Sequence, residues 1–295
     1  MKKLSPYLVF LAAMLWATDA PFRMELTKHL NSNFIVLAEH FVDVLFVLPI
    51  LLHGYAKLKK LTLHNWLAVV LIGVGGSALA SVAFTQAFRY VNPSVAILLQ
   101  KLQPFVAISL AAGVLKEKLS FKYWEWAVIA IGGAYLISFP NLKPQLFPGE
   151  QFNPNIIGVG YALLAALLWG ASTVFGKYVL ASTDYKMMTG LRFAVAFLFL
   201  VILNALSHSI PVLSQVDLAD WVFVVIISVT SGVVAIFVYY KGLENTSASV
   251  ATIAELGFPM AAVIVNWIFL DATLVPVQLL GMLVLVFAIF RLTRL

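Results

Sequence analysis

The chain has 295 residues, of which 62% are hydrophobic and only 11% are charged, and its formal net charge is +6. Soluble domains carry about 25% charged residues, so the composition excludes an ordinary soluble domain and predicts an all-α integral membrane protein. The absence of cysteine excludes disulfides, thiol nucleophiles and thiolate metal sites. The basic residues lie between apolar runs, where they set membrane orientation, and they do not predict binding to nucleic acid.

Ten apolar runs follow one another along the chain, and about 20 apolar residues are enough to cross the ~30 Å hydrocarbon core of a bilayer. They cover roughly 4–22, 34–52, 66–88, 93–115, 123–139, 156–177, 187–206, 220–240, 247–269 and 275–292. The first run resembles a signal peptide, but it contains Trp16 and Asp19 and lacks a small-residue cleavage site. We therefore interpret it as a retained transmembrane helix.

The distribution of Lys and Arg predicts the orientation of these helices. If the N-terminus is cytoplasmic, thirteen of these residues fall in cytoplasmic segments and four in outer loops, namely Arg23, Lys28, Arg89 and Lys143. Cytoplasmic loops carry the excess of Lys and Arg in membrane proteins. The sequence therefore predicts a multi-pass protein of a bacterial cytoplasmic membrane with both termini in the cytoplasm.

The two halves of the chain resemble each other. Residues 11–16 (LAAMLW) match residues 164–169 (LAALLW) at an offset of 153, and Ser94-Val95-Ala96 matches Ser249-Val250-Ala251 at an offset of 155. Chance similarity between Leu/Ala-rich helices explains the leucines and alanines, but it does not explain Trp, Phe and Pro in register. We predict two five-helix repeats, 1–140 and 156–295, joined by a linker loop at 141–155 that is rich in Pro and Asn.

Five spans per repeat is an odd number, so the second repeat must be inverted relative to the first. Inverted repeats are typical of secondary transporters, in which one half rocks against the other around a central site. A channel, or a membrane protein that does not transport, is the alternative on the same scaffold.

These motifs resemble the drug/metabolite transporter superfamily, and in particular its EamA-type members. The resemblance covers nearly all of both halves and rests on the Trp-containing first helices, on Arg192-Phe193, and on the stretch from Tyr240 to Pro259. Acidic residues, Glu117 and Asp271, end the fourth helix of each half. The family implies transport of small metabolites such as amino acids, amines or nucleotide-related compounds, often as export and often driven by a proton gradient.

Charged residues within the spans are candidate site residues, because the bilayer interior disfavours charge and such residues usually mark a pathway. Glu39 and Asp43 are four residues apart and share a helix face, and His40 can reach Asp43. With Asp19 they predict an acidic vestibule that carries protons or attracts a cationic substrate. The alternative is that these residues form a solvated helix end.

A second cluster is expected where the fourth helices of the two repeats meet. Lys101 and Glu255 fall near the middle of these helices, and an ion pair between them is the natural expectation, either structural or part of transport. Gln100 and Gln103 lie beside Lys101. Matching proline interruptions in corresponding spans are a pointer to a transporter site, and here they are Pro104 and Pro259.

Several other residues are expected to line the pathway or to pack beside it. Trp16, Trp169 and Tyr239 are aromatic candidates, and Arg192 either joins the pathway or extends to the membrane interface. Scattered histidines and missing catalytic motifs predict no metal site, no cofactor beyond a proton gradient, and no enzyme. The predicted function is secondary transport of a small polar metabolite, an amino acid or amine in particular, by a monomer or homodimer.

Overall fold

The computed structural model of the chain describes residues 4–91, 96, 99–138, 142, 156–211, 216–269, 275–292 and 294. All regular secondary structure in these residues is helical, as the sequence predicts. The helices are α1 Ser5–Trp16, α2 Ala20–Leu26, α3 Ser32–His53, α4 Tyr55–Leu58, α5 Leu63–Val70, η2 Leu71–Leu79, α6 Ala80–Ala87, α8 Gln103–Val114, α9 Phe121–Ser138, α10 Ile156–Val179, α11 Tyr185–Ser207, α12 Leu218–Ile227, η4 Ser228–Val234, α13 Ala235–Glu244, α14 Ala248–Ala254, α15 Gly257–Phe269 and α16 Pro276–Leu292.

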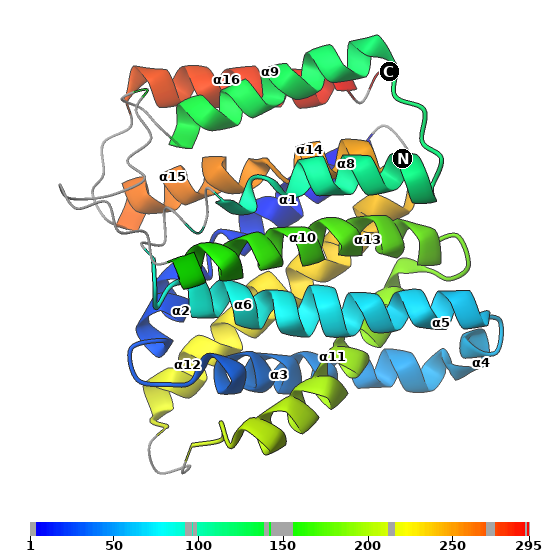
Figure 1. Cartoon of the computed structure of the whole chain (residues 1–295), viewed down its shortest axis with the longest axis vertical. Coiled ribbons are helices and arrows are strands. Elements are labelled where there is room, and N and C mark those ends of the chain that lie inside the picture. Colours follow the sequence, from blue (N-terminus) through cyan, green and yellow to red (C-terminus); the bar gives the residue numbers. More distant parts are fainter. Residues whose placement is uncertain are drawn as a thin grey trace.

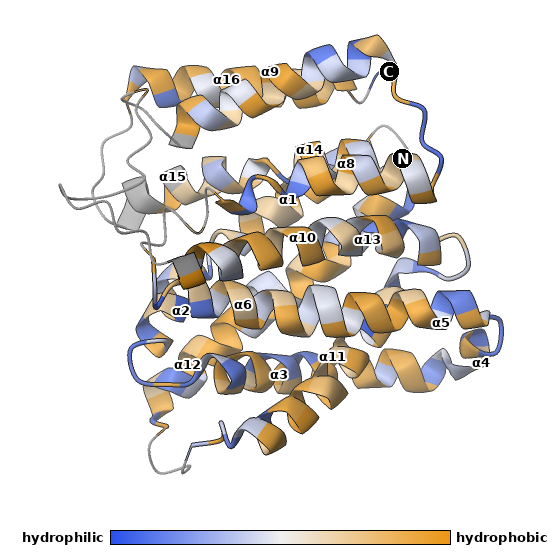
Figure 2. Ribbon diagram, viewed as in Figure 1, coloured by the Kyte–Doolittle hydropathy of each residue, from blue (hydrophilic) through white to orange (hydrophobic). Residues whose placement is uncertain are grey.

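The helices have the length and hydrophobicity of membrane spans. Within the described residues, five are long and apolar enough to cross a bilayer, and three shorter apolar helices accompany them. Figure 2 shows hydrophobic residues along the helices and many of the hydrophilic residues near their two ends. Large apolar side chains such as Leu45, Leu198 and Leu283 are exposed, as expected where a helix faces lipid.

Successive spans run in alternate directions between the two sides of the bundle (Figure 1). The first helix, α1, begins on the side where the N- and C-termini are marked, whereas α10, the first helix of the second half, begins on the opposite side. The second half is therefore inverted relative to the first, as the odd number of spans per repeat predicts. The predicted linker 141–155 lies outside the described residues except for Leu142.

Each half packs its helices against those of the other half, in a symmetric pattern. Helix α1 packs against α13 and α15, and its equivalent α10 packs against η2, α6 and α8. The second spans, α3 and α11, pair with each other, and so do the fifth, α9 and α16. The centre of the molecule is thus built by first, second, third and fourth spans of both halves.

The first span is not the continuous helix over 4–22 that the apolar run predicts. Helix α1 ends at Trp16, a turn follows, and α2 begins at Ala20. Proline fixes its own backbone and disfavours helix at the preceding residue, and Pro21 stands at the start of α2. Because of this break, Asp19 and Arg23 belong to a separate short helix and do not continue the direction of α1.

Both third spans contain a π-helical segment, η2 in the first half and η4 in the second. A π-helix is a rare insertion that widens the helix and is frequent at functional sites. Helix η2 packs against α11 and η4 packs against α3, so each π-helix faces the second span of the other half.

Two further contacts fix the frame around the centre. Gly133 of α9 and Gly281 of α16 bring their backbones together, because a Cβ on either would lie within 3.0 Å of the other helix's backbone. Glu117 accepts hydrogen bonds from the backbone N–H groups of Ala248 (2.8 Å) and Ser249 (3.1 Å) at the start of α14. A carboxylate from the first half thus caps a helix of the second.

Candidate functional site

A cavity lined by residues of both halves lies between them, and small-molecule sites in helical bundles are usually found between the helices. Eleven of the residues singled out in the sequence line it: Trp16, Asp19, Glu39, His40, Asp43, Gln100, Gln103, Trp169, Arg192, Tyr239 and Glu255. Lys101 and Pro104 instead line a smaller cleft beside it, together with Gln100, Gln103 and Glu255. Pro259 lies in α15, outside both linings.

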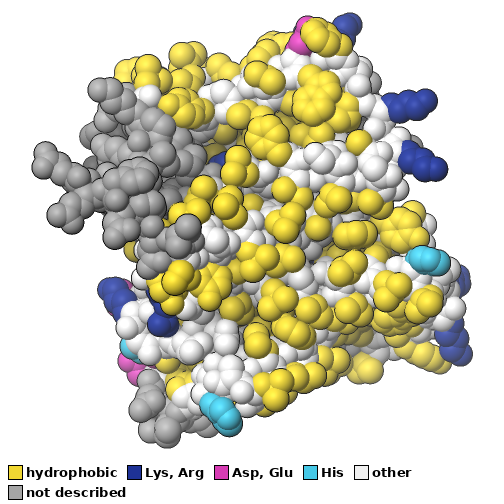
Figure 3. Space-filling view, viewed as in Figure 1, with side chains coloured by type: hydrophobic (Ala, Val, Ile, Leu, Met, Phe, Trp, Pro, Cys, Tyr) yellow, Lys and Arg dark blue, Asp and Glu magenta, His cyan; other side chains and the backbone are white. Residues whose placement is uncertain are grey.

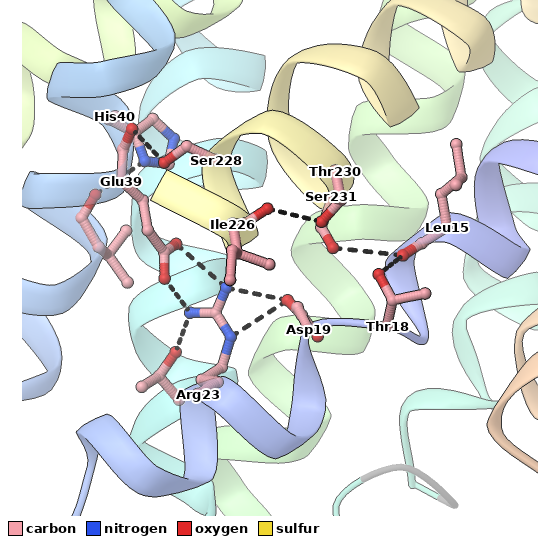
Figure 4. Close-up of polar contacts among 12 residues, drawn as sticks. Leu15, Thr18, Asp19, Arg23, Glu39, His40, Ile226, Ser228, Thr230 and Ser231 are labelled. Carbon is pink, nitrogen blue, oxygen red and sulfur yellow. Dashed lines mark hydrogen bonds and ion pairs between the residues drawn. The ribbon is translucent and has the colours of Figure 1, made fainter. Parts of the chain in front are cut away.

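Arg23 is the centre of a buried ion network at one end of the cavity. Its Nη1 and Nη2 lie 2.9 and 3.0 Å from the two carboxylate oxygens of Glu39, and its Nη2 also donates to Asp19 at 3.0 Å (Figure 4). Thr85 accepts from Nη1 at 2.9 Å. Only 6% of Arg23 is exposed, so its placement in an outer loop was wrong.

The network also corrects the prediction of an open acidic vestibule. Asp19 and Glu39 do not face the cavity as free carboxylates, because Arg23 holds both with its planar fork of donors. A buried charge is far less costly when it is paired and hydrogen-bonded. Two of the three predicted acids thus share one positive charge within the protein, and the three ionised groups together carry a net charge of −1.

His40 does not reach Asp43, contrary to expectation. Its Nδ1 lies 2.9 Å from the Val36 carbonyl oxygen, one turn earlier in α3, and its Nε2 lies 3.1 Å from Ser77 Oγ on η2. Asp43 lies deeper, with 1% of its surface exposed. Its Oδ1 is buried without a hydrogen-bond partner, against Gly232 of η4.

Arg192 stays inside the bundle, and it does not extend to the interface. It donates to Ser77 Oγ at 3.0 Å, to the Gly76 carbonyl at 2.9 Å and to Tyr240 Oη at 3.1 Å. All three acceptors are neutral, and two of them belong to η2. Within the described residues no carboxylate lies within 4.0 Å of Arg192, so it keeps a positive charge at the cavity wall.

Glu255 is the centre of a second polar cluster, in the turn between α14 and α15. It accepts hydrogen bonds from Tyr239 Oη at 2.9 Å, from Thr173 Oγ1 at 3.3 Å and from the side-chain amide of Gln103. The hydroxyl oxygens of Thr173 and Tyr239 lie 2.8 Å apart, and since each hydroxyl has one hydrogen, one of them donates either to the other or to Glu255. Three neutral donors from three helices therefore surround one carboxylate.

The predicted Lys101–Glu255 ion pair is not formed. Lys101 Nζ instead donates to Gln100 Oε1 at 3.2 Å and lies 4.2 Å from the centre of the Phe258 ring. Gln103 occupies the place beside Glu255 because α8 begins at that residue and its amide reaches the carboxylate directly.

Two aromatic pairs line the cavity in equivalent places. Trp16 packs on Tyr239 with ring centres 5.2 Å apart, and Trp169 packs on Phe84 with ring centres 5.1 Å apart. In each pair the tryptophan comes from the first span of one half and its partner from the third span of the other. Phe84 and Tyr239 are themselves 155 residues apart, which is the offset of the repeat.

Several residues that complete these clusters were not predicted from the sequence, although the spacing of some of them could have indicated their role. Arg23 stands four residues after Asp19 and could have been recognised as an i,i+4 ion pair on one helix. Thr173 stands one helical turn after Trp169. Phe84, Ser77 and Gly232 carried no such signal. No group of three or more acidic, His or Cys side chains among the described residues is placed to hold a metal ion.

An inverted all-helical membrane bundle with a polar and aromatic cavity between its halves has the architecture of secondary transporters. The chain belongs to the EamA-like transporter family, whose model matches residues 4–139 and again 156–294.

Individual relatives agree with this assignment. A protein named "Riboflavin transporter ImpX" from Fusobacterium nucleatum is 31% identical over 98% of this chain and 97% of its own length. An uncharacterized transporter of Synechocystis is 24% identical, covering 76% of this chain and 64% of its own. A crystal structure of a protein with 16% identity matches the fold with a TM-score of 0.76, over 97% of this chain and 95% of the other.

Proposed function

We propose that the protein carries riboflavin, or a flat polar heterocycle of closely similar chemistry, across the membrane by alternating access. The observation that carries this proposal is the cavity itself, because it combines aromatic walls with separate polar clusters. A planar heterocycle offers a face to aromatic rings and an edge of donors and acceptors to polar groups. The relative named as a riboflavin transporter, similar over almost its whole length, supports the same substrate.

The polar groups divide in a way that suits such a ligand. Glu255, with its three donors, lies next to Tyr239 and so next to the Trp16–Tyr239 pair. Serine side chains, Ser172 and Ser231 among them, line other parts of the wall, where they can bond the hydroxyl groups of a polyol chain.

The predicted amino acid or amine stays a prediction. Asp19 and Glu39 are already paired with Arg23, whereas Asp43 and Glu255 have no cationic partner among the described residues and are the carboxylates that a free amine would need.

The orientation with both termini in the cytoplasm belongs to the same proposal. Lys and Arg side chains gather along the edge of the molecule where the termini lie, and few interrupt the hydrophobic middle of the face in view (Figure 3). Cytoplasmic segments are the ones enriched in Lys and Arg.

Uptake of labelled riboflavin into proteoliposomes tests the proposal. We expect saturable uptake that excess unlabelled riboflavin abolishes and that excess amino acids or simple amines leave unchanged. Competition by an amino acid or amine would mean that this compound, and not riboflavin, is the substrate. Flux without saturation would support a channel. Binding in detergent, measured by quenching of riboflavin fluorescence, separates a failure to bind from a failure to transport.

A further inference from the structure

Asp43 is the cavity carboxylate without a partner. Of the four cavity carboxylates, Asp19 and Glu39 are held by Arg23, and Glu255 is held by three neutral donors. Asp43 is 1% exposed and its Oδ1 has no hydrogen-bond partner. It lies in the middle of α3, and in the described part of the chain no Lys, Arg or His nitrogen is within ion-pairing distance of it.

Packing does not require a carboxylate at this position. The repeat places Val195 of α11 where α3 has Asp43, at the offset of 152 that also joins His40 to Arg192. Val195 packs against a glycine of η2, Gly73, whose added Cβ would lie 2.7 Å away. Asp43 packs in the same manner against Gly232 of η4. A valine therefore stands at the corresponding position of the second span and makes a similar contact one helical turn along the opposing helix, so the acid at position 43 is a departure from the repeat.

The groups around Asp43 set its electrostatic environment. Glu39 and His40 lie on its own helix, Arg23 faces it from α2, and Arg192 faces it from α11. Of the other segments that pack against α3, η4 and α6 contribute no titratable side chain. Helix α12 contributes Asp220, which is paired with His29, and α4, which follows the C-terminal end of α3, contributes Tyr55 and Lys57. Glu39 shares Arg23 with Asp19, whereas Asp43 has no ion-pair partner of its own among the described residues.

We propose that Asp43 binds and releases a proton during the transport cycle, and that η4 controls access to it through Gly232. The proposal rests on the transport function above and adds its coupling ion. An ionisable residue within a membrane span that faces a cavity is typical of proton pathways. A metal cation would need about six oxygen ligands, whereas a proton needs only the one unpartnered oxygen that Asp43 has.

The mechanism follows from the position of the residue between the halves. Asp43 belongs to the first half and η4 to the second, and transport in inverted-repeat proteins rocks one half against the other. Gly232 has no side chain, so η4 covers the carboxylate closely. When η4 moves away, water reaches Asp43 and the carboxylate exchanges its proton with that side of the membrane. When η4 returns, the proton is held.

Infrared spectroscopy tests the proton site without any substrate. The purified protein should show a carboxylic-acid C=O band that disappears when the pH is raised. Asp43→Asn should lack this band, and Glu125→Gln, which changes an exposed carboxylate on α9, should keep it. A titrating band that persists unchanged in Asp43→Asn would overturn the proposal.

Transport into proteoliposomes tests the coupling. With a pH difference of about one unit, wild-type protein should accumulate riboflavin up to about tenfold in one polarity, since one unit corresponds to about 1.4 kcal/mol. Asp43→Asn should exchange riboflavin but reach only equal concentrations. The proposed proton coupling would be refuted if Asp43→Asn accumulated riboflavin as wild type does. It would also be refuted if the pH difference had no effect on transport by wild type. If wild type moves no riboflavin, the proposed substrate fails and the infrared band still decides the proton site.

Gly232→Ala tests the role of η4. Its added Cβ would overlap Asp43, so accumulation should fall while Gly160→Ala, whose Cβ would meet nothing within 4 Å, behaves as wild type. Full accumulation by Gly232→Ala would show that η4 does not control the site.

Discussion

Two similar contacts between the halves differ in the side chain that faces the glycine. Asp43 of α3 packs on Gly232 of η4, and Val195 of α11 packs on Gly73 of η2. Both place a side chain of a second span against a glycine of the opposing π-helix. The comparison shows that the same kind of contact forms with a carboxylate in one half and with an apolar side chain in the other.

The aromatic pairs show the same relation. Trp16–Tyr239 and Trp169–Phe84 have nearly equal spacings, but only Tyr239 has a hydroxyl, which it donates to Glu255. Repeat symmetry thus supplies the shape of the cavity, and single departures from it supply the polar groups. The predictions below test that division between structural and functional positions.

The largest effect is expected from removing Arg23. In Arg23→Met, Asp19 and Glu39 lose their partner inside the bundle, and breaking a buried ion pair costs about 3–5 kcal/mol. Lys28→Ala is the control, because the Lys28–Glu25 pair is exposed and such pairs contribute about 0–1 kcal/mol. Unfolding in detergent micelles measures both, and equal stability of the two variants would contradict a buried network.

Both glycine contacts should lose stability when a methyl group is added. Gly232→Ala and Gly73→Ala should each lose about 1–3 kcal/mol, the usual cost of overpacking. Gly160→Ala, which has open space, should be neutral or slightly more stable. A much larger loss at only one of the two glycines, in the same unfolding measurement, would mean that the contacts are not equivalent.

Tyr239→Phe makes the two aromatic pairs alike. Glu255 loses its donor at 2.9 Å, and we expect the riboflavin Kd to rise about tenfold, which corresponds to about 1.4 kcal/mol. Tyr178→Phe, a partly exposed tyrosine on α10, is the control in the same fluorescence titration. An unchanged Kd in Tyr239→Phe would mean that the Glu255 cluster does not contribute to binding of the substrate.

The smallest effect is expected at Asp184, outside the spans. Partial burial raises the pKa of Asp184, but hydrogen bonds from Lys57 and from the Met187 N–H outweigh it, so the pKa lies below its usual value. Its stabilisation is therefore present above the unfolded pKa of about 3.9 and is lost as the pH falls through the lower folded value. Asp184→Ala removes the cap of α11 and should cost about 1 kcal/mol at neutral pH, with no loss at strongly acidic pH.

Much of the architecture could be predicted from the sequence because it depends on apolar length and on repetition. Helix class, alternating direction and inversion follow from the runs, the offset and the odd number of spans. Eleven of the residues that line the cavity were also predicted, most of them because a charged side chain in a span rarely faces lipid.

Apart from the i,i+4 pair of Asp19 and Arg23, pairing could not be predicted, because it depends on local backbone geometry. The break before Pro21 brings Arg23 into the bundle, and no hydropathy count distinguishes that from an outer loop. The start of α8 decides that Gln103, and not Lys101, meets Glu255. The π-helices that supply Ser77 and Gly232 depend on the opposing helix, which a run of apolar residues does not describe.

Asp43→Val gives the second span of the first half the side chain that Val195 supplies in the second half, at the contact with the opposing π-helix. If the carboxylate serves proton coupling and not packing, the variant should be as stable as wild type within about 1.5 kcal/mol and should still bind riboflavin. It should fail to accumulate riboflavin in proteoliposomes under a pH difference that drives accumulation by wild type. Accumulation equal to that of wild type would contradict the role assigned to Asp43.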